Sequence, residues 1–141
     1  MNSSRPRRRG FTLVEVLLVL TILVIIVSLA TTSIVSMQRR AYLKAAELQV
    51  RLFKSQLECY HLDMSEFPTT EQGLEALRNQ PAGLVNPDDW AGPYSDEDVP
   101  LDPWNNPYQY MCPGQNNPDR YDLWSWGPDK QDRTEDDIGN W

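Results

Sequence analysis

The sequence is poor in the residues that build metal centres and catalytic sites. It has one histidine and two cysteines, and no CxxC pair. A zinc site needs about four ligands, so zinc is not expected. The adjacent carboxylates Asp136 and Asp137 lack an accompanying histidine or nucleophile, and adjacent side chains rarely converge on one substrate. The composition therefore argues against an enzyme.

Basic residues are scarce after residue 62, where 17 acidic side chains stand against four basic ones. Nucleic acid phosphates attract Lys and Arg, so this part of the chain is a poor match for nucleic acid. The formal net charge of the whole chain is −7. Such an acidic composition is typical of a soluble domain outside the cytoplasm, or of a domain that binds cations.

Proline and glycine are absent between Phe11 and Leu62. Residues 11–30 form an apolar run of about 20 residues, the length that a membrane-spanning helix requires. The basic residues Arg7–Arg9 precede it directly, and the positive-inside rule then keeps the N-terminus in the cytoplasm. An ordinary signal peptide cleaved near Ala30 is the alternative, but the apolar run is too long for one.

The same stretch continues into an amphipathic pattern. One apolar row steps by four and three residues, at Ala46, Val50, Phe53, Leu57 and Tyr60. A second apolar row runs alongside it, at Ala45, Leu48, Leu52 and Cys59. We therefore expect one continuous helix of about 50 residues, with a membrane half and an amphipathic half that packs on a domain.

The rest of the chain predicts a small sheet and irregular loops. Thr69 and Gln72 have the spacing of a capping box, which predicts a short helix as far as about Arg78. Residues 79–107 hold six of the eleven prolines and are expected to form loop. Residues 108–112 and 121–126 are the strand candidates. The predicted fold class is α+β, a long N-terminal helix packed on a small antiparallel sheet with a proline-rich loop region.

Glu15 is out of place in the apolar run. A carboxylate inside a membrane costs several kcal/mol even on the more modest scales, so it is normally paired or functional. The side chain of glutamate is too short to reach the interface easily. A partner within the membrane explains Glu15 better than contact with the interface.

The residues Arg8-Arg9-Gly10-Phe11-Thr12-Leu13-Val14-Glu15 resemble the processing site of type IV prepilins and pseudopilins. The resemblance implies that a membrane prepilin peptidase cuts after Gly10 and methylates the new amine of Phe11. It also implies that Glu15 pairs with the N-terminal amine of a neighbouring subunit during assembly. Two buried charges offset each other's desolvation only when they meet, so the physics agrees.

Later blocks extend the resemblance to nearly the whole chain. Residues 67–74, 102–108, 127–129 and 134–138 are similar to the major pseudopilin of type II secretion systems. The resemblance implies a structural subunit that polymerises into the periplasmic pseudopilus of such a system. The expected partners are further copies in a helical filament, prepilin peptidase, the inner-membrane assembly platform and minor pseudopilins. The alternatives are a surface type IV pilin and a membrane-anchored calcium- or carbohydrate-binding module that never polymerises.

Three segments follow from the resemblance. Residues 1–10 are expected to be a cytoplasmic leader that is cleaved, and residues 11–32 a transmembrane and polymerisation helix. Residues 33–141 are expected to be a periplasmic pseudopilin domain. The protein would then cross the inner membrane once, with its N-terminus in the cytoplasm and its C-terminal domain in the periplasm.

The acidic loop at residues 129–137 is a candidate calcium site. Calcium takes six to eight oxygen ligands, but the spacing does not fit an EF-hand. The residues alone favour a solvated acidic surface. The resemblance instead implies calcium held by the carboxylates of Asp129, Asp136 and Asp137 and by carbonyls near Trp126 and Gln131. Lys130 and Arg133 stand where the family often has glycine, which restricts the turn and lowers the expected affinity.

The two cysteines, Cys59 and Cys112, leave two readings open. In a domain outside the cytoplasm they could form one disulfide, which would tie the helix to the sheet. The alternative is a pair of free or buried thiols, because separation along the chain does not determine separation in space.

We predict that the mature chain begins at Phe11 and carries a methylated amine. Removal of residues 1–10 takes away four positive charges and moves the formal charge from −7 to −11. Mass spectrometry of the purified protein measures both changes. Retention of Met1, or cleavage near Ala30, would contradict the prediction.

Overall fold

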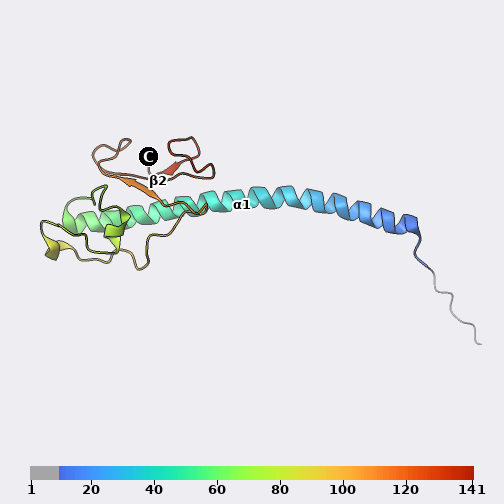
Figure 1. The fold of residues 1–141 in the computed structure, drawn as a ribbon, viewed down its shortest axis with the longest axis horizontal. Coiled ribbons are helices and arrows are strands. Elements are labelled where there is room, and N and C mark those ends of the chain that lie inside the picture. Colours follow the sequence, from blue (N-terminus) through green and yellow to red (C-terminus); the bar gives the residue numbers. More distant parts are fainter. Residues whose placement is uncertain (1–9) are drawn as a thin grey trace, which may run out of the picture. The chain divides into compact units, whose positions relative to one another are not determined.

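The structure is a computed structural model that describes residues 10–141, apart from the side chains of residues 29–33. The chain divides into two compact units, Met1–Arg39 and Arg40–Trp141, and each unit is described by itself. Residues 1–9 of the predicted leader lie outside the described residues. The structural core and all strands belong to the second unit (Figure 1).

Helix α1 is a single α-helix of 52 residues, Leu13–Met64, and confirms the predicted continuous helix. It begins where the hydroxyl of Thr12 accepts a hydrogen bond from the backbone N–H of Glu15, at 3.3 Å. It ends at Met64, and the next residue, Ser65, has a left-handed φ of 59° and donates its N–H to the carbonyl of His61 at 2.8 Å. A left-handed residue after the last turn is a common helix terminator.

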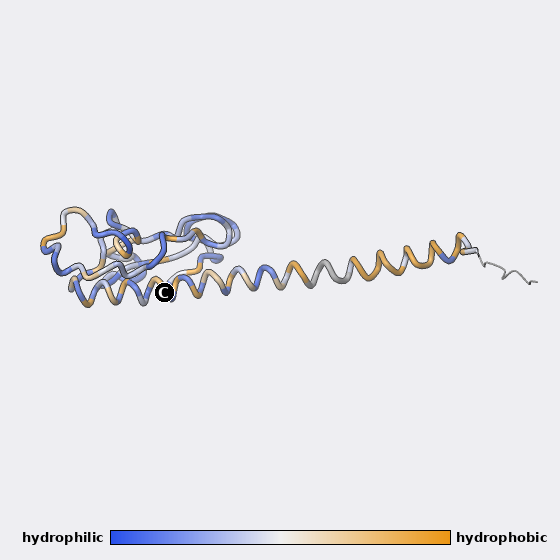
Figure 2. The backbone as a smooth tube through the Cα atoms, turned by 90° about the horizontal axis from the view of Figure 1, so that it is seen from below, coloured by the Kyte–Doolittle hydropathy of each residue, from blue (hydrophilic) through white to orange (hydrophobic). Residues whose placement is uncertain are grey.

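The first unit carries most of the apolar surface of α1. Figure 2 shows the hydrophobic colouring of this part of the helix, and the large apolar side chains from Leu13 to Val27 are all exposed. Within the described residues, none of the helices combines the length and apolarity needed to cross a membrane. The membrane-spanning role of residues 11–32 stays a prediction.

In the second unit, α1 buries only one of the two predicted apolar rows. Ala46, Val50, Phe53, Leu57 and Tyr60 are each at most 5% exposed, as expected. The second row remains at the surface: Ala45 and Cys59 are exposed, and Leu48 and Leu52 are 54% and 51% exposed. The expectation that both rows pack on the domain was therefore wrong for the second row, because the chain that packs on α1 covers only the face that carries the first row.

The chain after α1 forms the predicted capping box. The N–H of Thr69 donates to Oε1 of Gln72 at 2.9 Å, and the N–H of Gln72 donates to Oγ1 of Thr69 at 3.3 Å. A short 3₁₀ helix, η1 (Leu74–Leu77), follows and buries three of its side chains. A second 3₁₀ helix, η2 (Pro87–Asp89), interrupts the proline-rich loop region.

The sheet has three short antiparallel strands in the order β1-β2-β3. Strands β1 (Gln109–Met111) and β2 (Asp122–Ser125) confirm the two strand candidates. Strand β3 (Ile138–Gly139) has only two residues and was not predicted. Tyr108 and Leu123 are buried with the apolar row of α1 in one core cluster, so sheet and helix share a single core.

A buried carboxylate organises the turn between β1 and β2. Asp122 is 2% exposed and accepts hydrogen bonds from the backbone N–H groups of Gln115 and Asn116, both at 2.7 Å, and of Asn117 at 3.0 Å. Burial opposes its charge, but these donors and the Asn117 side chain together hold the pKa of its carboxyl below the usual value. Asp122 thus accepts the backbone N–H groups of this irregular turn that have no strand partner.

Asp122→Asn is expected to destabilise the chain by about 1.5–3 kcal/mol at neutral pH, because charge-assisted bonds to buried N–H groups are lost. Asp119→Asn, in the same turn but exposed, is the matched control and should change little. Since the folded pKa of Asp122 is lowered, its contribution is complete above the unfolded value of about 3.9 and falls as the pH drops below it. Urea denaturation at several pH values should show the difference between parent and variant shrinking in acid; a constant difference would contradict this.

Candidate functional site

The N-terminal candidate residues lie at the start of α1. Gly10 and Phe11 precede the helix and are exposed, Phe11 at 82%. Glu15 lies in the first turn and is also exposed. Within the described residues its carboxylate forms no ion pair, and its pairing with a neighbouring copy stays a prediction.

The C-terminal candidate loop begins where β2 ends. The hydroxyl of Ser125 donates to Oδ2 of Asp102 at 2.5 Å and accepts from the N–H of Gly127 at 3.1 Å. Asp102 is itself 3% exposed and accepts the N–H groups of Trp104 at 3.0 Å and Asn106 at 2.8 Å. The buried carboxylate of Asp102 therefore anchors two loops. This role of Asp102 was not predicted from the sequence.

The two ends of the loop touch at Gly127. Its φ is 70°, and a Cβ atom at this position would lie 2.3 Å from the carbonyl oxygen of Asp136. No larger residue fits there, because the clash would be with backbone. The chain from Gly127 to Asp136 consequently curls back on itself, as a loop that wraps a cation must.

The loop turns at two positions that are occupied by residues other than glycine. Lys130 has a φ of 58° and Arg133 a φ of 62°, both in the left-handed region. This conformation costs a non-glycine residue about 1–2 kcal/mol. Lys130 and Arg133 therefore make this turn more strained than glycine would at the same positions.

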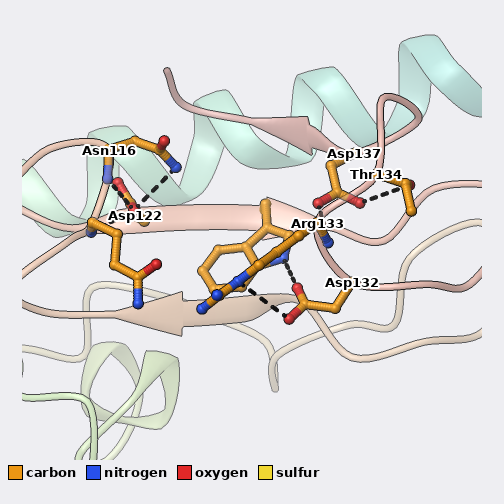
Figure 3. A network of polar contacts seen from close by, with 8 residues as sticks. Asn116, Asp122, Asp132, Arg133, Thr134 and Asp137 are labelled. Atoms are coloured by element: carbon orange, nitrogen blue, oxygen red, sulfur yellow. Dashed lines mark hydrogen bonds and ion pairs between the residues drawn. The ribbon is translucent and has the colours of Figure 1, made fainter.

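Hydrogen bonds within the loop already occupy some of its carboxylates (Figure 3). Asp137 accepts the N–H of Arg133 at 2.9 Å, and Asp129 accepts the N–H of Gln131 at 3.0 Å. Asp132 accepts the indole N–H of Trp124 at 3.0 Å, which fastens the loop to the sheet.

The carboxyl of Asp137 is half-buried, and its burial raises its pKa. The hydrogen bonds from Arg133 and Thr134 oppose that rise, and the negative charges of Asp132 and Asp129 add to it. Burial is the largest cause of this rise, and the neighbouring carboxylate of Asp132 is itself paired with Arg133 at 3.7 Å.

The predicted calcium ligands meet the chemical requirement for the ion but are not gathered around one point. Asp129, Asp136 and Asp137 offer the hard oxygen donors that calcium prefers. Among residues 10–141, no three His, Cys, Asp or Glu side chains are arranged to share a metal. The indole N–H of Trp126, which begins the loop, is buried without a hydrogen-bond partner. Joint ligation by the three aspartates, with carbonyls of Trp126 and Gln131, would require the loop to tighten.

Both cysteines are free thiols in the structure, so the possible disulfide is not formed. Cys59 lies on the exposed row of α1, away from the buried row that faces the sheet. The thiol of Cys112 donates to the carbonyl of Arg120 at 3.6 Å, and its backbone N–H donates to the hydroxyl of Thr70 at 2.9 Å. The two side chains therefore have different neighbours.

Comparison with known proteins gives two family matches. Residues 33–141 match the family described as type II secretion system (T2SS), protein G. Residues 5–31 match the prokaryotic N-terminal methylation motif, the segment that contains Gly10, Phe11 and Glu15.

Individual relatives agree with the family matches. The chain is 38% identical to the type II secretion system core protein G of Pseudomonas aeruginosa, with 97% of each chain covered. It is 39% identical to the core protein G of Aeromonas hydrophila, covering 97% of this chain and 94% of that one. The crystal structure of the major pseudopilin from the type 2 secretion system of enterohaemorrhagic Escherichia coli superposes with a TM-score of 0.65 at 37% identity, covering 76% of this chain and 92% of that chain.

Proposed function

The chain belongs to the protein G family of type II secretion systems, the major pseudopilins, and we propose that it is processed at Gly10, assembled through Glu15 and stabilised by calcium at its C-terminal loop. As a member of this family it is a structural subunit of the pseudopilus and not an enzyme. The observation that carries this conclusion is the joint match of the methylation motif and the protein G domain in one chain.

Processing is proposed to occur between Gly10 and Phe11 by a prepilin peptidase. The methylation motif covers this bond, and both residues are exposed and precede the first turn of α1. An exposed, non-helical peptide is accessible to a peptidase. The cut leaves Phe11 as the new N-terminal residue, four positions before Glu15.

The proposed location is the inner membrane, crossed once, with the N-terminus in the cytoplasm and the domain in the periplasm. Support comes from the apolar run at residues 11–30 and from the arginines that precede it. The acidic composition after residue 62 agrees with a domain outside the cytoplasm. The inner-membrane assembly platform and minor pseudopilins are the further partners proposed for such a subunit.

Glu15 is proposed to bind the N-terminal amine of Phe11 in a neighbouring copy. The exposed apolar side chains from Leu13 to Val27 supply a surface that a bundle of such helices can bury. A carboxylate inside that bundle is costly unless an opposite charge meets it. This pairing would therefore fix how far one subunit is shifted along the filament axis relative to its neighbour.

Calcium is proposed to gather Asp129, Asp136 and Asp137, with carbonyls near Trp126 and Gln131. The closed base of the loop at Gly127 and the negative charges of Asp129 and Asp132 near Asp137 support this proposal. Bound calcium would offset the repulsion between these carboxylates and hold the C-terminal residues of the loop against the sheet.

Glu15→Leu is expected to leave the chain membrane-associated but to abolish filament formation, because the partner amine loses its counter-charge. Electron microscopy of cells that overproduce the secretion system, with quantification of sheared filaments, measures the effect. Glu15→Asp, which keeps the charge on a shorter stem, is the matched variant and should retain part of the yield. Normal filament yield from Glu15→Leu would contradict the proposed pairing, and a parent chain that forms no filaments would favour the anchored module that does not polymerise.

Calcium should raise the unfolding temperature of the full-length chain in detergent, and chelation should lower it. At a hundredfold excess over the dissociation constant the stabilisation is about 2.7 kcal/mol. Magnesium should substitute poorly, since it demands a tighter octahedral shell. Asp136→Ala should abolish the response, and exposed Glu135→Ala is the control that should keep it.

Lys130→Gly removes left-handed strain from the same loop and should strengthen the calcium response, whereas Lys130→Ala should not. If neither calcium nor chelator changes the unfolding temperature, the calcium proposal is wrong and the loop is a solvated acidic surface.

A further inference from the structure

A small pocket lies between strand β2, the turn that precedes it and the loop that follows it (Figure 3). Its volume is about 230 Å³. Pockets for drug-sized ligands measure roughly 300–1,000 Å³, so this one suits a smaller molecule of about one ring. The residues that a ligand would meet there are Gln115, Asn116, Trp124, Arg133, Asp137 and Trp141.

The aromatic side of the pocket has one buried and one accessible indole. Trp124 is 9% exposed and donates its N–H to Asp132 at 3.0 Å. Trp141 is 55% exposed, and its ring centroid lies 6.0 Å from that of Trp124. The indole N–H of Trp141 forms no hydrogen bond within the described residues. Trp124 therefore supports Trp141 from within the fold, and Trp141 presents an apolar ring and an unused donor to a ligand.

The polar side of the pocket has donors and acceptors that the fold leaves unused. The side-chain amide of Gln115 and the terminal guanidinium nitrogens of Arg133 form no hydrogen bond within the described part of the chain. Asn116 donates its amide N–H to Asp122 at 3.2 Å and keeps the oxygen of the amide as an acceptor. Donors and acceptors thus stand side by side. A hydroxyl group matches such a surface, because it both donates and accepts.

The charges of the pocket disfavour an ionic ligand. The carboxylates of Asp122 and Asp137 line it together with the guanidinium of Arg133. An anion would approach two carboxylates, and an organic cation would approach the guanidinium. Juxtaposed like charges are costly, and a neutral ligand avoids both encounters.

We propose that this pocket binds a neutral saccharide of about one ring, with Trp141 against a C–H face of the sugar and Gln115 and Arg133 on its hydroxyl groups. A sugar ring carries C–H groups on its faces and hydroxyl groups at its rim. The negative face of an indole attracts C–H groups, and unused donors and acceptors replace the water that the hydroxyl groups lose. The site is separate from Glu15 and does not depend on filament assembly.

Ligand-detected NMR on the full-length chain in detergent tests this site, at one fixed calcium concentration. The neutral probes are glucose, galactose and N-acetylglucosamine, and the charged probes are glucosamine, glucuronate and free alanine. The detergent is lauryldimethylamine oxide, because alkyl maltosides carry a sugar that would compete. We expect at least one neutral sugar to bind with a dissociation constant of about 1 mM, as is reasonable for a ligand of this size, and the charged probes to bind more weakly.

Substitutions locate the binding. Trp141→Ala should weaken the affinity for that sugar about tenfold, and Gln115→Ala about threefold. Trp141→Phe keeps an aromatic ring and should retain most of the affinity. Trp104→Ala is the matched control, because Trp104 is a half-buried tryptophan outside the pocket, and it should leave the affinity unchanged. An unfolding temperature measured for each variant in the same detergent separates a lost contact from a lost fold.

Three results would overturn the proposal. The first is that no neutral sugar binds at about fifty times the expected dissociation constant. The second is that glucuronate, glucosamine or alanine binds more tightly than every neutral sugar. The third is that the affinity is unchanged in a folded Trp141→Ala variant, which would place the sugar elsewhere. None of these results bears on the pseudopilus function, which filament yield measures separately.

Discussion

The burial of one apolar row of α1 is the contact on which the second unit depends. The strands of the sheet have only three, four and two residues, and strands this short do not form a stable sheet alone. Leu123 and Tyr121 on and beside β2 lie in one cluster with Phe53 and Leu57 of the helix, and Phe53 meets Tyr108 edge-to-face with ring centroids 5.2 Å apart. The helix supplies the apolar surface that the sheet lacks.

Because the sheet is so small, buried carboxylates hold much of the remaining chain. Asp102 anchors its own loop and, through Ser125, the end of β2, and Asp122 holds the turn between β1 and β2. A buried carboxylate that accepts several backbone N–H groups satisfies donors that no strand ladder reaches. Some of the acidic residues of the domain are therefore buried structural anchors, and the others lie at its surface.

Exposed basic side chains lie on the helix, and most exposed acidic side chains lie on the loops. The helix carries exposed cations at Arg51 and Lys54, and the loops carry the excess of carboxylates. The strained C-terminal loop, with left-handed Lys130 and Arg133, brings negative charge close to these cations, because Asp137 lines the same pocket as Arg51 and Lys54.

The sequence by itself determined the continuous helix, the capping box at Thr69, the two longer strands and the family. These features depend on local spacing, on the absence of proline and glycine, and on short motifs, all of which are readable along the chain. The tertiary structure decided which apolar row of α1 is buried, that Cys59 and Cys112 have different neighbours, and that Asp102 and Asp122 are interior anchors. It also revealed β3, whose two residues carry no periodicity. Burial and pairing depend on what lies opposite a residue, and the opposite surface comes from a distant part of the chain.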